Sequence, residues 1–325
     1  ITNFANQTSQ KIANLEARAT ENKQRNLNEE DTRKVKEWRN QLTRDLNDGK
    51  SVEKLRMEGF RVEHDLQPCQ NVFLDLGSNV GDTLQKLIDS FIPPINGTRY
   101  MMDFETGKIG DRCYGCGGKK ERAASLRFLD KLPKVMPLKP EDYCFVGVEG
   151  NPNFVTTLQA KQSMVMRLRP RPVQSVHFLT RHIVTGKDGP STLYLDTIND
   201  KVNFWGSSIY DSHIDVAKSG GKKTGVDVMG ITLTTLLKRV AVPNGIVFIK
   251  MDIEGAEYPV LEEALESNVF CEYGQEKDVK ILLLLEHHGD RIVGSDKPRL
   301  HWKSIDGENR MKKCGIRIIR GNGGR

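Results

Sequence analysis

Apolar strings of strand length alternate with amphipathic segments from residue 71 onward. Six segments have the length and apolar content of strands: 71–76, 144–149, 176–184, 191–196, 246–252 and 279–286. Four segments show the apolar spacing of amphipathic helices: 82–91, 152–161, 233–240 and 256–267. Because strands alternate with helices, and several strands are apolar throughout, the sequence predicts an α/β fold with a mainly parallel sheet covered on both faces.

The segment before this core has a different composition. Nearly half of residues 10–58 are charged, and Val35, Trp38, Leu42 and Leu46 form only a thin apolar stripe at helical spacing. We therefore expect residues 1–66 to form a charged helical stalk or appendage.

Two further segments depart from the alternating pattern of the core domain, which we place at 67–300. Residues 93–142 are irregular, contain many Gly and Pro and are too long for an ordinary connection, so they predict an inserted lid or binding loop. Residues 301–325 are basic and end in a glycine-rich stretch, which indicates a last strand plus a solvated tail.

Composition excludes two classes of partner. No apolar run reaches the roughly 18 residues needed to span a membrane, so we expect no span in this chain. The net charge of +6 over 325 residues comes without a concentrated basic stripe, and nucleic acid is therefore not an expected partner. The number of subunits is left open by the sequence.

Cysteine and asparagine patterns favour a secretory compartment. The chain begins at Ile1 rather than Met and contains two glycosylation sequons, at Asn6 and Asn96. An even number of cysteines fits disulfides better than zinc, because the single CxxC pair has no second pair beside it. The six cysteines, whose pairing stays open, are Cys69, Cys113, Cys116, Cys144, Cys271 and Cys314. Cys113 and Cys116 lie in the insertion and Cys144 follows it, so we expect cross-links that stabilise a lid.

The first motif is the Gly-rich turn of residues 75–82, between a predicted strand and helix. Its glycines allow a sharp turn and close approach to a ligand at a helix N-terminus. The G-x-N-x-G spacing and the flanking carboxylates disfavour a pyrophosphate and suit the cationic methionine part of S-adenosylmethionine. The candidate cofactor-binding residues here are Asp75, Gly77, Ser78, Asn79, Gly81 and Asp82.

Two further motifs end predicted strands. Glu149 ends the second core strand, where a carboxylate can accept hydrogen bonds from both ribose hydroxyls of an adenosine, and Asn151 follows it. Lys250 and Asp252 end a buried strand at the same edge of the sheet. Glu254 and Glu257 come next, and their interpretation stays open between a functional role and a favourable interaction with the helix dipole.

The last motif is Glu286-His287-His288, after the final predicted core strand. A hydroxyl acceptor gains from a base within hydrogen-bond reach, and His287, His288 or Asp252 could supply it. Alternatively, Asp252, Glu286 and His287 could gather a divalent cation that lowers the pKa of the acceptor. We take Asp252, His287, His288 and Lys250 as the catalytic candidates.

These motifs, in this order, resemble the FkbM family of methyltransferases. That family combines D-x-G-x-N-x-G, an E-P-N-like motif, a polar hairpin, a T-L-D helix and K-x-D-x-E-G-x-E. The hairpin is matched here by residues 185–189 and the helix by 231–237. The chain departs from the pattern at Gly150, where Pro is frequent, at Thr235, where Asp is frequent, and in the long insertion.

The resemblance implies a Rossmann-like methyltransferase fold, S-adenosylmethionine as cofactor and usually O-methylation of sugars or of small molecules that contain them. We therefore predict a lumenal enzyme that methylates a hydroxyl of a carbohydrate acceptor. The alternatives are a cytoplasmic O-methyltransferase of small natural products and a non-catalytic binding module with this fold.

Overall fold

The computed structural model describes residues 66–95, 98–114, 130–293 and 297–320. The chain divides into two units, residues 1–53 and 54–325. The first unit, and with it nearly all of the expected appendage, lies outside the described residues. The same holds for Cys116 and for the two sequon asparagines.

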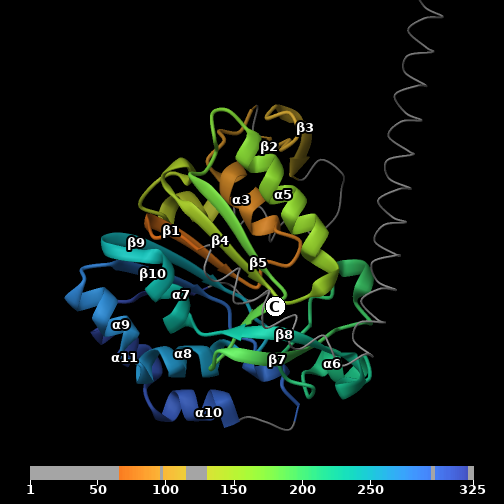
Figure 1. The fold of residues 1–325 in the computed structure, drawn as a ribbon, viewed down its shortest axis with the longest axis vertical. Coiled ribbons are helices and arrows are strands. Elements are labelled where there is room, and N and C mark those ends of the chain that lie inside the picture. The colour runs from red at the N-terminus through yellow and green to blue at the C-terminus, as the bar shows by residue number, and fades with distance from the viewer. Residues whose placement is uncertain (1–65, 96–97, 115–129, 294–296, 321–325) are drawn as a thin grey trace, which may run out of the picture. The chain divides into compact units, whose positions relative to one another are not determined.

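A six-stranded sheet, parallel throughout, forms the centre of the second unit (Figure 1). Its spatial order is β11-β10-β9-β1-β4-β5. The strands are β1 (Cys69–Leu76), β4 (Cys144–Glu149), β5 (Ser175–Thr180), β9 (Ala241–Met251), β10 (Lys280–Leu285) and β11 (Arg317–Arg320). This arrangement confirms the predicted α/β class with a parallel sheet and is consistent with a Rossmann-like methyltransferase fold.

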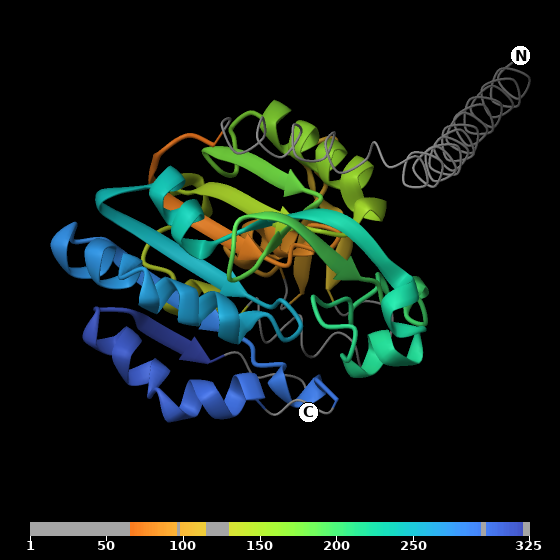
Figure 2. The ribbon, with the colours of Figure 1, turned by 60° about the horizontal axis from the view of Figure 1, so that its bottom comes forward.

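Helices cover both faces of the sheet (Figures 1 and 2). On one face Phe73 packs among the apolar side chains of α3 and α5, and on the other Leu74 packs among those of α7 and α8. This division follows from the period of two along β1, which turns successive side chains to opposite faces. The helices are α3 (Asp82–Ser90), α5 (Val155–Arg167), α6 (Ile214–Lys218), α7 (Leu233–Val240), α8 (Glu257–Glu266), α9 (Val269–Cys271), α10 (Lys297–Ser304) and α11 (Gly307–Lys313).

Two smaller sheets lie beside the central one. The first, in the order β6-β8-β7, consists of β6 (His182–Val184), β7 (Gly189–Tyr194) and β8 (Gly225–Ile231). The second is an antiparallel hairpin of β2 (Arg99–Met102) and β3 (Ile109–Tyr114), within the predicted insertion. Short turns of 3₁₀ or π type complete the fold: η1 (Pro140–Asp142), η2 (Pro152–Phe154), η3 (Asp200–Val202), η4 (Gly221–Thr224), η5 (Glu272–Glu276) and η6 (Gly289–Arg291).

The expected single strand over 176–184 is wrong. Arg181 has φ 60, a left-handed conformation that no strand continues through. The chain therefore leaves the central sheet at β5, and residues 182–184 pair with β8 in the small sheet instead.

The order of strands reverses at β1. From β1 the chain proceeds to β4 and β5 on one side, and later to β9, β10 and β11 on the other. The loops after β1 and β9 consequently run in different directions and leave a crevice at the carboxyl edge of the sheet, where open α/β folds bind ligands.

Two disulfides cross-link the described part of the chain and confirm that cysteines pair. Cys69–Cys144 joins the first residues of β1 and β4, and Cys271–Cys314 joins α9 to the end of α11. The expectation that Cys144 helps to cross-link a lid is wrong, because its partner lies in the central sheet at the edge remote from the crevice. Among the described helices, none combines the length and apolar character needed to cross a membrane.

Candidate active site

A cavity of about 1020 Å³ lies at the carboxyl edge of the central sheet. The loops after four neighbouring strands, β1, β4, β9 and β10, contribute side chains to it. Among the lining residues are Gly77, Asn79, Asp82, Glu149, Asn151, Lys250, Asp252, Glu254, Glu286 and His288. The structure thus brings together most of the residues that the sequence motifs single out.

The loop after β1 needs glycine at two positions. Gly77 has φ 86, and a Cβ there would lie 2.1 Å from the carbonyl oxygen of Asp252, so the two crossing loops touch only because no side chain intervenes. Gly81 has φ 72 at the start of α3. Lys161 from α5 donates to the carbonyl oxygens of Val80 and Gly81 at 2.9 and 3.0 Å and holds this turn closed.

Three charged groups lie beneath and beside this loop. Asp75 is completely buried, and its Oδ1 lies 3.4 Å from Lys250 Nζ, which also lies 3.2 Å from Asp252 Oδ2. Burial raises the pKa of Asp75 to about 6, although Lys250 acts in the opposite direction. Burial would lower the pKa of Lys250, but Asp252 and Asp75 outweigh it and raise that pKa.

Two candidates of the first motif thus support the site from beneath. Asp75 and Ser78 are fully buried and are not among the residues that line the cavity. The Ser78 hydroxyl donates to the backbone carbonyl of Asp75. Asp82 does line the cavity and is paired with Lys86, which lowers its pKa against the opposing effect of burial.

Glu149 is held at the end of β4 by two backbone donors. Asn79 N–H donates to its Oε2 at 2.6 Å and Asn151 N–H to its Oε1 at 2.7 Å. Burial raises the pKa of Glu149 to about 7, and the two backbone hydrogen bonds only partly offset that effect. Each oxygen retains a second lone pair, so the carboxylate can still accept two hydroxyl donors from the cavity.

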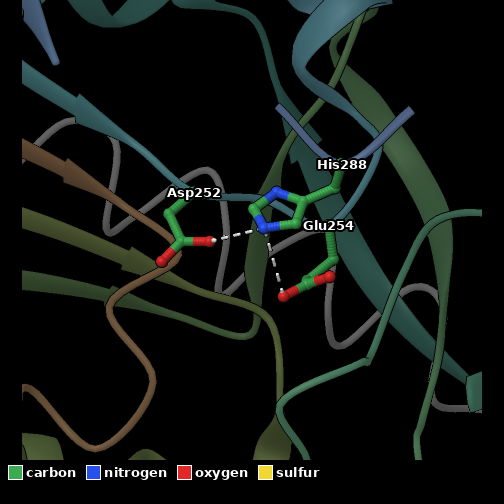
Figure 3. Close-up of side chains that lie close together, drawn as sticks. All are labelled: Asp252, Glu254 and His288. Carbon is green, nitrogen blue, oxygen red and sulfur yellow. Dashed lines mark ion pairs between the residues drawn. The ribbon is translucent and has the colours of Figure 1, made fainter. Parts of the chain in front are cut away.

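Asp252, Glu254 and His288 all line the cavity, and their side chains lie close together in a cluster that we call the cavity floor (Figure 3). His288 Nε2 lies 3.8 Å from Asp252 Oδ1 and 3.8 Å from Glu254 Oε1. Its Nδ1 lies 2.9 Å from Oε1 of the buried Glu257, and because a carboxylate only accepts, Nδ1 carries the hydrogen. Burial would lower the pKa of His288, but the bond to Glu257 and the nearby Glu254 raise it to about 9.

The neighbouring residues of the last motif face different surroundings. The His287 ring stacks on Tyr258 with centroids 5.8 Å apart, and its Nε2 lies 3.8 Å from Glu308. His287 does not line the cavity, whereas Glu286 and His288 do. Of the two histidines, then, only His288 is placed among the groups at the floor. The expected metal set of Asp252, Glu286 and His287 is not the one assembled.

Sequence reasoning missed three parts of the site. It left Glu254 between two interpretations, and it overlooked Glu257 as the partner of His288.

It also overlooked the loop after β7, which places Trp205 at the cavity with 61% of its surface exposed. The side-chain amide of Asn79 donates to the carbonyl of Asn203 at 2.7 Å and ties this loop to the first motif. The only sequence signal for this loop was Trp205 itself, an aromatic residue in a polar segment.

Comparison with known families decides the class of the protein. The family model of the methyltransferase FkbM domain matches residues 131–292. This chain carries an FkbM methyltransferase domain. The resemblance in the motifs is thereby confirmed, and the protein is an S-adenosylmethionine-dependent methyltransferase. No curated protein and no solved structure matches the chain.

The FkbM match covers β4 to β10 and so includes Glu149, Asp252, Glu254 and His288. The Gly-rich turn after β1 precedes the matched range. In the structure this turn and the matched segment form one site, since Gly77 contacts Asp252 and the backbone N–H of Asn79 donates to Glu149.

Proposed function

We propose that this FkbM methyltransferase transfers a methyl group to a hydroxyl oxygen of a carbohydrate acceptor. The observation that carries the proposal is the shared cavity, which is lined both by Glu149 and residues of the Gly-rich turn and by Asp252, Glu254 and His288. A cofactor site beside a group of proton acceptors and cation ligands is the arrangement that alkylation of a weak nucleophile requires.

The residues of the first part fit S-adenosylmethionine. Glu149 would accept the two ribose hydroxyls, and Asn151 lies beside it. The turn at Gly77 and Gly81 leaves room for the close approach of the methionine part, near the carboxylate of Asp82. The cofactor supplies the electrophilic methyl group, and the chain positions the acceptor oxygen in line with it.

Asp252 would assist the loss of the acceptor proton at the floor of the cavity, and His288, whose pKa of about 9 keeps it protonated near neutral pH, would stabilise the negative charge that develops on the acceptor oxygen. Lys250 keeps Asp252 in place through its contact with Oδ2, and buried Asp75 in turn holds Lys250. We therefore assign Lys250 and Asp75 a positioning role and Asp252 and His288 the contact with the acceptor.

The expected effect of Glu149→Ala is a loss of about 1.5–3 kcal/mol in cofactor affinity, or roughly 10- to 150-fold in Kd. Because ribose hydroxyls bind the ionised carboxylate, and the pKa of Glu149 is about 7, wild-type affinity should fall as the pH drops below that value. Titration calorimetry with S-adenosylhomocysteine measures both effects. Glu149→Gln should bind weakly without this pH dependence, and unchanged affinity in Glu149→Ala would contradict the assignment.

Trp205 supports a sugar acceptor. Its exposed ring borders the cavity on a loop that the buried Asp196 holds, since Asp196 accepts from Gly206 N–H and from Asn199. A rigid, exposed aromatic ring at a polar cavity suits the apolar face of a sugar ring, which stacks on it while the hydroxyls reach polar groups.

For Trp205→Ala we expect KM for the carbohydrate acceptor to rise roughly tenfold, which corresponds to about 1.4 kcal/mol of stacking. Trp205→Phe should recover most of the loss, because a smaller ring still stacks. Steady-state kinetics tests this, with S-adenosylhomocysteine affinity as the control that both variants must retain. An unchanged KM in Trp205→Ala would show that the acceptor binds elsewhere.

We further infer that the enzyme works in an oxidising, lumenal compartment, where Asn6 and Asn96 would be glycosylation sites. The two disulfides support this proposal, because such bonds persist in the secretory pathway and are reduced in the cytosol. The cytoplasmic enzyme for small natural products is the alternative, and the non-catalytic module lacks support from the family match.

A direct assay tests the function. The purified protein is incubated with S-adenosylmethionine labelled in the methyl group and with two sets of acceptors, neutral oligosaccharides and phenolic small molecules. We expect label in alkali-stable ethers of the oligosaccharides, and none with the Glu149→Ala variant under limiting cofactor. Label confined to the small molecules would favour the alternative.

A further inference from the structure

The three side chains at the cavity floor share a feature that hydrogen bonding does not explain. Each of them turns one ligand atom toward the other two: Oδ1 of Asp252, Oε1 of Glu254 and Nε2 of His288, all within 4.8 Å of one another (Figure 3). Both contacts of Nε2 measure 3.8 Å. A hydrogen on Nε2 that bonded to either carboxylate would bring the atoms to about 2.7–3.2 Å.

The opposite atom of each ligand faces a different neighbour. Lys250 Nζ lies 3.2 Å from Asp252 Oδ2, and the completely buried His213 has Nε2 3.4 Å from Glu254 Oε2. His288 Nδ1 lies 2.9 Å from the buried Glu257, which also accepts from Gly255 N–H. The contacts behind Asp252 and His288 are hydrogen bonds, whereas His213 and Glu254 Oε2 face each other without one. Hydrogen-bonded partners behind ligands are typical of metal centres, because they fix the orientation of the imidazole and carboxylates.

We propose that Asp252, Glu254 and His288 bind one divalent cation. The catalytic role of this cation rests on the proposed function. Ligand atoms at these separations leave room for an ion about 2.0–2.5 Å from each, the range of metal bonds to nitrogen and carboxylate oxygen. One imidazole with two carboxylates suits an ion such as Mn²⁺. Three protein ligands leave open coordination positions on the cavity side.

Those open positions give the cation its role. An acceptor hydroxyl that binds the cation through oxygen loses its proton more readily, because the metal stabilises the alkoxide. Two adjacent hydroxyls could occupy two positions together, which selects acceptors with a vicinal diol, a common feature of sugars. The alkoxide oxygen then forms the bond to the methyl carbon, the sulfonium takes the electrons of the broken carbon–sulfur bond, and the proton passes to solvent or to Glu286.

The test is titration of the chelator-treated full chain with Mn²⁺ alone, followed by electron paramagnetic resonance, without cofactor or acceptor. We expect one ion per wild-type chain and a loss of at least tenfold in affinity in Glu254→Gln and in Asp252→Asn. His287→Gln is the matched control and should bind as the wild type does, because His287 lies outside the cluster. The positioning variant Glu257→Gln should weaken binding roughly 10- to 100-fold.

Circular dichroism of each variant distinguishes a loss of binding from a loss of folding. Because two ligands are replaced separately, misfolding of one variant leaves the other as a test. Absence of bound Mn²⁺ in the wild type, or equal affinity in all variants, would overturn the metal site. Methyl transfer that persists in excess chelator would also overturn it while leaving the proposed function intact. A wild-type protein that binds Mn²⁺ but transfers no methyl group to any acceptor would instead count against the proposed function.

Discussion

Replacement of Asp252 by Asn together with His288 by Ala should lower methyl transfer by roughly 10²–10⁴-fold and leave cofactor binding nearly intact. The two side chains line the same cavity as Glu149, but the Glu149 carboxylate is held by the backbone N–H groups of Asn79 and Asn151, which neither replacement removes. Removal of the floor groups eliminates assistance to deprotonation, whether they act as proton acceptors or as metal ligands, but not the proposed ribose contacts.

The measurement is single-turnover transfer of a labelled methyl group, with calorimetry of S-adenosylhomocysteine binding on the same preparations. His287→Ala is the control, since its ring packs against Tyr258 and lies outside the cavity lining. Wild-type turnover in the triple variant of Asp252, His287 and His288 would rule out this floor as the catalytic site. Equal losses in His287→Ala and His288→Ala would show that the defect is one of folding.

Loss of either disulfide should destabilise the protein by about 2–4 kcal/mol. Cys69–Cys144 closes a loop with a sequence separation of 75 and Cys271–Cys314 one with a separation of 43. Each bond restricts the unfolded chain, so its removal favours unfolding although no contact at the cavity changes. We expect a lower denaturant midpoint in Cys144→Ala and in Cys314→Ala.

Urea unfolding of both variants measures this effect, and each variant should also carry one unpaired thiol from the lost partner. The remote position of both disulfides predicts unchanged affinity for S-adenosylhomocysteine at temperatures where the variants stay folded. Mass spectrometry of unreduced wild-type protein from a eukaryotic secretory host tests the compartment. Six free thiols with unmodified Asn6 and Asn96 would refute the lumenal proposal.

The sequence alone determined the sheet and the residue types at its carboxyl edge. Apolar runs and Gly-rich turns are local signals. A strand buried on both faces requires consecutive apolar residues, and a left-handed turn favours glycine at a given position. The class of fold, the turn at Gly77 and the strand-end position of Glu149 and Asp252 follow from such signals. Motif order was enough to identify the FkbM resemblance.

Only the tertiary structure decided which side chains meet. His287 and His288 are adjacent in the sequence, and a shift of one residue at a strand end decides which faces the cavity. Glu254 reaches the floor because its backbone takes φ 48, a left-handed conformation that this loop imposes on a residue other than glycine. The interruption between β5 and β6 likewise lies at a left-handed residue other than glycine, Arg181.

Long-range pairing was equally beyond the sequence. Cys69 and Cys144 meet because β1 and β4 are neighbours in a parallel sheet, and six cysteines by themselves allow many pairings. The contact between Glu257 and His288 joins α8 to the loop after β10, 31 positions apart in the chain. Local patterns thus specified the elements and their chemistry, while the packing of distant loops against one another determined the geometry of the cavity floor.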